Sequence, residues 1–414
     1  MLFTHPGLLA SYALLTLIAI QAVFSARFWW AIKLRRKVAA PTVLPRTGVI
    51  LSLRGSDAYL TEALHGLLRQ DHPDYFVQIV VDSKQDPAWK TAQRVVEELG
   101  VDNVNLGELR TRRSTCSLKC SSLIQAVNDL DPACEVVAFM DADVIPHPTW
   151  LRELVSPLTD PAIGCTTGNR WYLPGKNNWG SAVRSAWNAA AMISMYTFKI
   201  TWGGTLALRR KTLEASPLME RWSRSFNDDI IVGDLIREMG LRMQFVPTLI
   251  MVNREEVTLA SCLPWVARQM VHARFYQANW PLVASFSLFS AIMPFLCALI
   301  GLGYLIVGDP VGWVCLATAV LHSISLDLLW SHNSRFVCQL MGQTYDSNWK
   351  MGTRVMHATL GANLMFAAAL VSAMTSNTVR WRGITYRIRS RWNVEMVEYL
   401  PYSTTAPTEA SISH

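Results

Sequence analysis

Two carboxylates one residue apart are the part of this chain best suited to chemistry. The stretch 136–146 begins with an unbroken apolar run, and Asp141 and Asp143 follow it directly. Such a run predicts a strand buried on both faces of a parallel sheet, and the carboxyl ends of such strands border the ligand crevice. Asp is seldom buried without a partner, whereas Mg²⁺ binds one or two carboxylates together with phosphate oxygens. The spacing favours a divalent cation that carries a diphosphate, and an acidic turn is the alternative.

Two further charged residues lie where predicted elements begin or end. Asp82 follows a strand predicted over 77–81, where a carboxylate can reach a ribose or a base. Capping of the next helix explains Asp82 equally well. Lys119 lies in the segment 114–122, which opens a helix, and a lysine at a helix start can hold an anion. An exposed helical lysine is the simpler interpretation.

Paired glycines and a second pair of acids follow in the middle of the chain. Gly203 and Gly204 come directly after Trp202 and allow a ligand to approach the backbone closely, although Gly-Gly also marks any tight turn. Asp228 and Asp229 precede an amphipathic helix. They are either a helix cap with a favourable dipole charge or catalytic carboxylates.

A helix predicted over 258–277 mixes aromatic and basic residues at helical spacing. It carries Arg268, His272 and Arg274. This mixture suits an interfacial helix near a lipid headgroup or a diphosphate, and a solvated helix face is the alternative.

Strands and helices alternate in the first half of the chain, which predicts a doubly wound α/β domain. Besides the strand that opens 136–146, strands are predicted over 47–53, 77–81, 164–172 and 241–251, with helices over 59–69, 89–99 and 150–158. An almost uncharged helix over 182–198 is too short to span a membrane comfortably. It either lies in the interface or belongs to the core of the domain.

The composition indicates a membrane component. The 414 residues are 51% hydrophobic, with a mean hydropathy of +0.19, 16 Trp and 16 Met. A net charge of +7 suits anionic membrane surfaces or phosphate substrates. Nucleic acid is not expected as a partner, because the basic residues cluster beside apolar segments. The 8 Cys are scattered without a Cys-x-x-Cys pair, which favours reduced, packed thiols.

Four apolar segments are long enough to cross a bilayer, at 7–30, 282–307, 311–330 and 355–375. Positive charge follows the first one, which predicts a retained anchor with the amino terminus outside. One span before the domain and three after it would place the arginine-rich tail outside, against the positive-inside rule. Either one segment only dips into the membrane, or the rule fails here.

These patterns divide the chain into five parts. They are an anchor with its basic juxtamembrane segment (1–40), an α/β domain expected in the cytosol (41–258), an interfacial helix (259–280), C-terminal transmembrane helices (281–376) and a basic tail with a disordered C-terminus (377–414).

The order of the acidic motifs resembles that of membrane-bound, inverting glycosyltransferases with a GT-A fold. The motifs are Asp82, the Asp141-Ala142-Asp143 pair and Asp228-Asp229, over roughly residues 45–280. Within that superfamily the chain is most similar to the ceramide glucosyltransferases. Asp86-Pro87-Ala88, the Lys119 segment and the tail stretch Val379–Arg387 match that branch and extend the resemblance to nearly the whole chain.

The resemblance implies a role for each candidate residue. Asp229, with Asp228 beside it, would be the general base, and Asp143 with Asp141 would hold a divalent metal, Mg²⁺ or Mn²⁺. The donor, a UDP-sugar, would contact Asp82, Lys119, Asp141, Arg268 and Arg274, and the acceptor would contact Trp202, Gly203, Gly204 and His272.

One stretch departs from the family pattern. The family closes its site with Gln/Arg-x-x-Arg-Trp, whereas the corresponding stretch here is Arg268-Gln269-Met270-Val271-His272. The first arginine is kept, and a cation for the leaving diphosphate and an aromatic floor for the acceptor are lost. Arg274 is the candidate replacement for the lost charge.

The resemblance implies transfer of a sugar, glucose by analogy, from UDP to the hydroxyl of a membrane lipid at the cytosolic face. Ceramide, diacylglycerol or a hopanoid-like lipid is the expected acceptor, in the inner membrane of a bacterium or the Golgi of a eukaryote. Two alternatives stay open. A processive polysaccharide synthase is disfavoured by the small number of downstream spans, and a catalytically inactive lipid- or nucleotide-binding membrane protein is supported only by the degenerate closing stretch.

Overall fold

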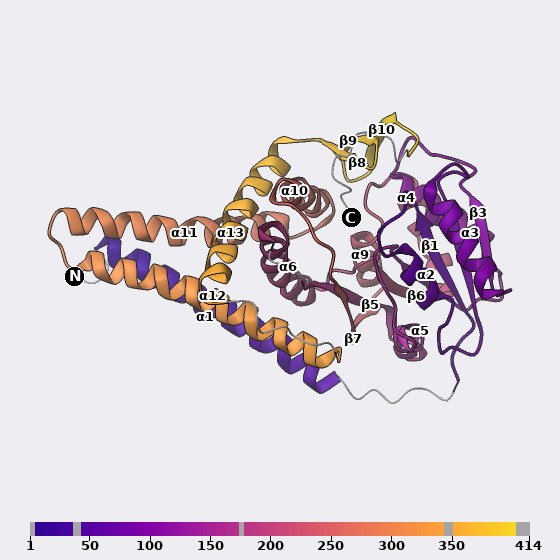
Figure 1. The fold of residues 1–414 in the computed structure, drawn as a ribbon, viewed down its shortest axis with the longest axis horizontal. Helices are drawn as coiled ribbons and strands as arrows, with labels where there is room; N and C mark the ends of the chain where they lie inside the picture. Colours follow the sequence, from indigo (N-terminus) through magenta and orange to yellow (C-terminus); the bar gives the residue numbers. More distant parts are fainter. Residues whose placement is uncertain (1–4, 36–42, 174–177, 343–350, 403–414) are drawn as a thin grey trace.

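A seven-stranded sheet forms the centre of the α/β domain (Figure 1). The computed structural model describes residues 5–35, 43–173, 178–342 and 351–402. The strand order is β3-β2-β1-β4-β6-β5-β7. The strands are β1 (Thr47–Leu53), β2 (Tyr75–Val81), β3 (Val104–Glu108), β4 (Val136–Met140), β5 (Ile163–Tyr172), β6 (Thr205–Arg209) and β7 (Arg242–Asn253).

The α/β prediction is confirmed, but the sheet is mixed rather than parallel. β4 runs parallel to β1 and antiparallel to β6, and β6 is also antiparallel to β5. All five residues of β4 are buried, which is why the sequence shows an unbroken apolar run there. Burial on both faces does not encode the direction of the neighbouring strand, so the reversal at β6 leaves no signal in that run. The strand ends at Met140, and Asp141 to Pro146 form the loop that follows.

Helices cover both faces of the sheet and position its loops. Asp86 caps α3 by accepting a hydrogen bond from the backbone N of Ala88, and Ser117 caps α4 by accepting one from Cys120. The helices of the domain are α2 (Leu60–Leu67), α3 (Pro87–Leu99), α4 (Leu118–Asp129), α5 (Trp150–Val155), α6 (Trp179–Phe198), α7 (Arg210–Glu214), α8 (Leu218–Trp222), α9 (Ile230–Glu238) and α10 (Leu259–Tyr276), with a short 3-10 turn over Ser156–Thr159.

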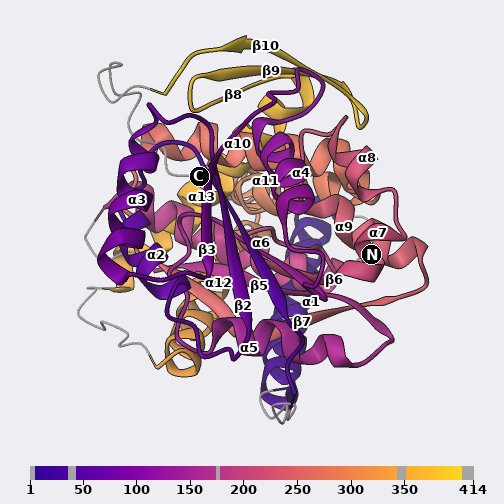
Figure 2. The same cartoon turned by 90° about the vertical axis from the view of Figure 1, so that its right-hand side faces the viewer.

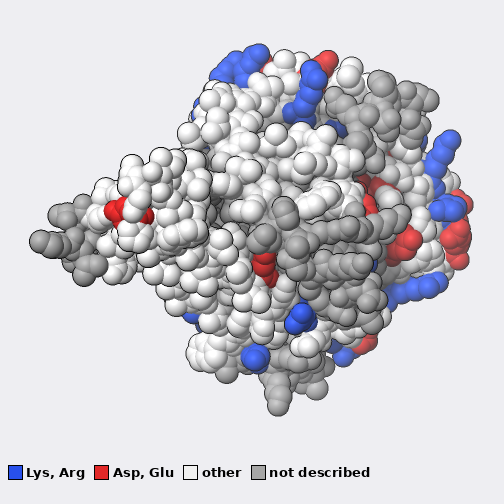
Figure 3. Space-filling model, turned by 60° about the vertical axis from the view of Figure 1, so that its left-hand side comes forward, with Lys and Arg blue, Asp and Glu red and all other residues white. Residues whose placement is uncertain are grey.

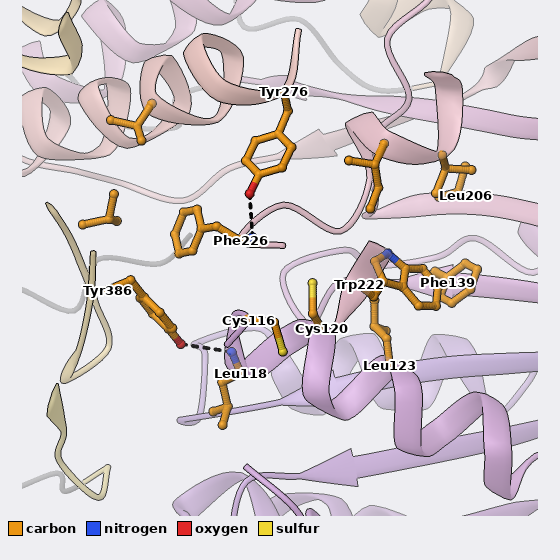
Figure 4. Packing of buried hydrophobic residues seen from close by; sticks show 14 of the residues in the cluster. Cys116, Leu118, Cys120, Leu123, Phe139, Leu206, Trp222, Phe226, Tyr276 and Tyr386 are labelled. Carbon is orange, nitrogen blue, oxygen red and sulfur yellow. Dashed lines mark hydrogen bonds between the residues drawn. The ribbon is translucent and has the colours of Figure 1, made fainter. Parts of the chain in front are cut away.

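The core beside α4 combines apolar packing with buried hydroxyl contacts (Figure 4). Phe139 and Trp222 meet edge to face, with ring centroids 5.7 Å apart. The Tyr276 hydroxyl accepts a hydrogen bond from the backbone N of Phe226 at 2.7 Å. All eight cysteines lie within the described residues, and each is buried and unpaired, which confirms the expectation of packed thiols.

Three long helices project from the domain as a bundle (Figure 1). They are α1 (Pro6–Arg35), α11 (Trp280–Ile306) and α12 (Val311–Leu340). With α13 (Met351–Thr375), they are the four helices among the described residues that are long and apolar enough to cross a membrane. Figure 3 shows that the projecting surface carries few charged side chains. Membrane helices are therefore supported as predicted.

The end points of α12 and α13 bear on the conflict with the positive-inside rule. The last turns of α12 pack with Phe28 of α1 against β5 and β7, on the side of the domain. α13 also ends on that side, because Arg274 of α10 donates hydrogen bonds to the carbonyls of Ala373 and Ser376. The described ends of α12 and α13 therefore both lie beside the domain.

The arginine-rich tail is folded into a second sheet, which the sequence analysis does not predict. β8 (Thr378–Trp381), β9 (Ile384–Ser390) and β10 (Asn393–Tyr399) form an antiparallel sheet in the order β10-β9-β8. This C-terminal sheet lies beside α4 and α10 (Figure 2). The backbone N of Met396 donates to the carbonyl of Ser114, and the backbone N of Leu118 donates to the Tyr386 hydroxyl. The predicted disorder over residues 403–414 lies outside the described residues.

Gly180 provides a test of the packing between α6 and α10. A Cβ on Gly180 would lie 2.3 Å from the backbone of Val257 and Thr258, just before α10, and backbone cannot move aside as a side chain can. We expect Gly180→Ala to lower the free energy of unfolding by about 1–3 kcal/mol. Thermal denaturation of the purified full-length protein in detergent measures the change. The matched control is Gly303→Ala, because a Cβ on Gly303 in α11 meets no atom within 4 Å. Equal melting temperatures of the two variants would contradict the packing.

Candidate active site

One cavity of about 420 Å³ brings most of the predicted residues together. It begins at the carboxyl ends of β1 and β4 and at the start of α9, and it continues between α6 and the four apolar helices. The charged residues that line it are Arg54, Asp57, Lys119, Asp141, Asp143, Arg170, Asp228, Asp229, Arg268 and Arg382. Trp202 and His272 line it as well.

Lys119 joins two acidic motifs that are far apart in the sequence. Its Nζ lies 2.6 Å from Asp141 Oδ1 and 2.8 Å from Asp228 Oδ2. Burial lowers the pKa of Lys119, but the charges of Asp141, Asp228 and Asp229 outweigh burial and raise that pKa well above its usual value. Burial raises the pKa of Asp228 to about 6, although Lys119 opposes the change. Lys119 is therefore a permanent cation that holds Asp141 and Asp228 together.

Asp229 is fixed by three donors. Its carboxylate accepts hydrogen bonds from the backbone N of Gly203 (2.8 Å), the backbone N of Ile230 (2.7 Å) and Nδ2 of Asn227 (2.8 Å). It thus caps α9, as the simpler interpretation of the sequence predicts, and it also lines the cavity. A Cβ on Gly203 would lie 2.7 Å from Asp228 Oδ2, so the glycine allows the backbone to approach the chain's own acids.

Asp143 is the residue best suited to hold a metal. It is buried, and its Oδ2 lies 3.4 Å from Nη1 of Arg170, while its Oδ1 has no hydrogen-bond partner among the described residues. Burial raises the pKa of Asp143 to about 7 against the opposing charge of Arg170. A buried carboxylate oxygen that accepts nothing is costly unless a cation binds there. Within the described residues, no group of three His, Cys, Asp or Glu side chains could hold a metal ion, so Asp141 and Asp143 would supply two ligands at most.

Arg268 and His272 of α10 both line the cavity, but they differ in charge near pH 7. Among the described residues, Arg268 forms no ion pair, and its guanidinium lies 5.8 Å from the centre of the Trp381 ring. Burial lowers the pKa of Arg268 to about 9, and the charges of Arg170 and Arg382 add to the effect. Burial also lowers the pKa of His272 to about 3, so this ring is neutral near pH 7. Asn227 links His272 to Asp229, because its amide lies 3.0 Å from His272 Nδ1 and also donates to the carboxylate.

Two predicted donor-binding residues do not line the cavity. Asp82 is buried, and its carboxylate accepts hydrogen bonds from Arg54, from Arg112 Nε at 2.8 Å and from the Tyr399 hydroxyl at 2.8 Å. Arg274 donates to the end of α13, as described above, and the structure does not bring its charge to the site. Contacts of Asp82 and Arg274 with a nucleotide stay predictions.

Several residues of the cavity were not found from the sequence. Arg54 and Asp57 follow β1, Arg170 lies within β5, and Trp381 and Arg382 lie at the turn between β8 and β9. Arg54 follows a strand just as Asp82 does, so its position was a usable signal. Arg170 gave no such signal, because it reaches the cavity only through contacts distant in sequence. Arg382 lies in the tail stretch Val379–Arg387 that matches the family branch, but no role in the site was assigned to it.

Comparison with known families decides the class of protein. The family model described as glycosyl transferase family 21 matches residues 13–394. The chain belongs to this family. Glycosyl transfer is thereby confirmed as its class of reaction, and the acids gathered around Lys119 lie in the cavity of a glycosyltransferase. No curated protein matches the chain significantly.

Solved structures show weaker similarity to this glycosyltransferase. A mannosyltransferase from Pyrobaculum calidifontis, in complex with GDP-Man and Mn²⁺, is 18% identical, with a TM-score of 0.47 over 88% of this chain and 97% of its own. GalNAc-T7 with UDP, GalNAc and Mn²⁺ is 14% identical, with a TM-score of 0.38 over 52% of this chain and 44% of its own. Glucosyl-3-phosphoglycerate synthase from Mycobacterium tuberculosis, in complex with phosphoglyceric acid, is 15% identical, with a TM-score of 0.38 over 57% of this chain and 79% of its own.

Removing the shared cation tests the electrostatics of the site. Lys119→Gln leaves Asp141 and Asp228 close together without the positive charge, and we expect a loss of about 1–3 kcal/mol in the free energy of unfolding. Lys119 lowers the pKa of Asp228, so its removal raises that pKa further above the unfolded value. A folded state that binds more protons than the unfolded state loses stability as pH rises.

The difference in melting temperature between wild type and Lys119→Gln should therefore be larger at pH 8 than at pH 5.5. Thermal denaturation with a chelator present measures it without interference from metal. The control is Lys90→Gln, an exposed lysine of α3. A difference that grows at acid pH would contradict this account.

Proposed function

We propose that the protein is an inverting lipid glycosyltransferase with a GT-A domain. It transfers a sugar, glucose by family resemblance, from a UDP-sugar to the hydroxyl of a membrane lipid such as ceramide. The observation that carries the proposal is the course of the cavity, which joins the acids around Lys119 to space between the apolar helices. The reaction takes place at the cytosolic face, where water-soluble donor and bilayer-bound acceptor can both reach one site.

The membrane half of the cavity suits alkyl chains. Its walls come from α1, α6, α11, α12 and α13. They include Phe24, Ala190, Phe286, Leu329, Ala362 and Phe366. A lipid acceptor could keep its chains among these side chains while its hydroxyl reaches the carboxylates.

The other half of the cavity suits a nucleotide diphosphate. Ligands of α/β sheets bind at the carboxyl ends of the strands, which here contribute Asp141, Asp143 and Arg54. Lys119 and Arg268 supply positive charge, and Arg268 has no carboxylate partner among the described residues. An arginine of this kind favours phosphate oxygens.

A divalent metal fits the pair of acids. The unpartnered oxygen of Asp143 and the carboxylate of Asp141 would hold it, with the remaining ligands from phosphate oxygens and water. Bound there, Mg²⁺ or Mn²⁺ would offset the charge that develops on the departing diphosphate.

Asp229 acts as the general base in this proposal. A lipid hydroxyl has a pKa far above 7, so its proton must leave as the new bond forms. The donors from Gly203, Asn227 and Ile230 fix the orientation of the Asp229 carboxylate. The acceptor oxygen attacks the anomeric carbon, the bond to the diphosphate breaks, and its electron pair stays on the phosphate oxygen. One such displacement inverts the anomeric configuration. Asp228 keeps Lys119 beside that phosphate.

Asp229→Asn tests the base. The amide cannot accept the proton, so we expect transfer of radiolabel from UDP-[³H]glucose into organic-extractable lipid to fall by at least about 100-fold. The matched control is Asp102→Asn, an exposed carboxylate before β3, which should behave as wild type. Near-normal transfer by Asp229→Asn would remove this residue from the role. Label recovered in polymer would support the polysaccharide synthase, and no label in any product of the wild type would support the inactive protein.

Ala190→Trp tests whether the lipid occupies the cavity. A tryptophan at this position of α6 would fill the apolar half, so we expect transfer to lipid to fall by about tenfold or more, with donor binding unchanged. Transfer rate and equilibrium binding of labelled UDP-glucose are measured on the same preparation. Ala368→Trp is the control, because Ala368 of α13 is exposed and does not line the cavity. Equal transfer by both variants would place the acceptor elsewhere.

A further inference from the structure

The turn between β8 and β9 has an unusual residue. Trp381 pairs with Ile384, so Arg382 and Gly383 alone connect the two strands. Both have positive φ, 46° for Arg382 and 77° for Gly383. Tight hairpin turns with this geometry favour Asn-Gly, because a larger side chain is strained in the left-handed region. A strained residue that is kept in a turn points to a contact that requires it.

The contacts of Arg382 explain its presence. Its guanidinium lies 2.5 Å from Asp57 Oδ1 and also donates to the main-chain carbonyl of Arg54. The main-chain carbonyl of Arg382 in turn accepts from Arg54, at 3.0 Å from Nε and 2.8 Å from Nη2. Arg54 and Asp57 belong to the loop that leaves β1 and enters α2. The hairpin tip, Trp381-Arg382-Gly383, therefore both donates hydrogen bonds to this loop and accepts them from it.

The same C-terminal sheet also holds the end of β2. Arg54 donates to the carboxylate of Asp82 and, at 2.5 Å, to the carbonyl of Leu400. The Tyr399 hydroxyl donates to Asp82 at 2.8 Å. The carboxyl ends of β1 and β2 are where a sheet of this kind binds a nucleotide. Both ends are tied to residues near the end of the chain.

The hairpin tip also forms part of the cavity wall. Trp381 and Arg382 both line the cavity, and the indole of Trp381 lies against the guanidinium of Arg268. Arg268 is the cation that has no carboxylate partner among the described residues. On α10 the positions around His272 offer no aromatic ring and no second cation to this part of the cavity. The hairpin tip brings both from a different element.

We propose that the hairpin tip is a component of the donor site. Arg382 is a positioning residue that fixes the conformation of the β1–α2 loop in which a nucleoside diphosphate sugar binds. Trp381 orients Arg268 towards the diphosphate. This inference rests on the proposed function for the identity of the donor. It assigns to the C-terminal sheet a part in donor affinity, with no part in acceptor binding.

Arg382→Asn separates this role from a structural one. Asn-Gly suits the turn better than Arg-Gly, so the turn is relieved of strain while the contacts with Asp57 and Arg54 are lost. We expect the KM for UDP-glucose to rise by about tenfold or more, with the KM for the lipid acceptor unchanged within about twofold. The melting temperature should stay within a few degrees of that of wild type, because relief of strain in the turn offsets part of the cost of leaving Asp57 without its partner. Arg382→Lys should restore part of the donor affinity, because one ammonium can replace only one of the two contacts.

The experiment uses the full-length protein in nanodiscs with Mn²⁺. It measures equilibrium binding of UDP-[³H]glucose alongside transfer to lipid. Arg387→Ala is the control, since Arg387 of β9 is exposed on the same sheet and pairs with Glu395. An unchanged donor KM and binding constant in a folded Arg382→Asn protein would overturn the inference, and so would an equal rise in the KM of the acceptor. Wild type that binds UDP-glucose without transferring it would overturn the proposed function alone. Wild type that does not bind UDP-glucose would overturn both.

Discussion

The site depends on the two ion pairs that Lys119 forms with Asp141 and Asp228. Asp141 follows β4 and Asp228 precedes α9, so the two carboxylates come from separate parts of the domain and repel each other when ionised. A single ammonium between them makes their approach favourable. Its own position is set by α4, whose first turn is capped by Ser117 and fixed by the Tyr386 hydroxyl on Leu118. The two acids therefore converge because the start of α4 places a cation between them.

The cavity has a polar half at the strand ends and an apolar half between the long helices, and α6 borders both. Its first half is buried, with Gly180 close to the backbone before α10, while Ala190 and Ile193 line the cavity. The absence of charged side chains after Arg184 until Lys199 allows one helix to face β5 on one side and the apolar helices on the other. Of the two interpretations that the sequence permits for this helix, its burial agrees with a core helix. It is a core helix that also borders the membrane half of the cavity.

Much of the sheet and part of the site could be predicted from the sequence, and the rest could not for identifiable reasons. Apolar runs located β1, β2, β4 and β5. Of the predicted acids at their ends, Asp141 and Asp143 after β4 line the cavity, whereas Asp82 after β2 is bound by Arg54, Arg112 and Tyr399 instead. The direction of β6 was not encoded in burial. The C-terminal sheet did have a signal, since Ile384, Tyr386 and Ile388 alternate with polar residues at the spacing of a strand. The arginines among them favoured a basic tail instead. No local pattern could reveal the contact of Arg54 with Asp82 and Leu400, because its partners are distant in sequence.

The path of the last 50 residues connects the two halves of the cavity. Ala362 and Phe366 of α13 line the membrane half, and Trp381 and Arg382 line the half that contains the strand ends. Only the end of α13 and the short β8 lie between them, and Arg274 fixes the end of α13 by bonding its last carbonyls. The hairpin tip is therefore joined to the membrane half by a fixed helix end and a short strand. This gives a physical reason for an arginine-rich tail to return to the domain instead of ending at the membrane.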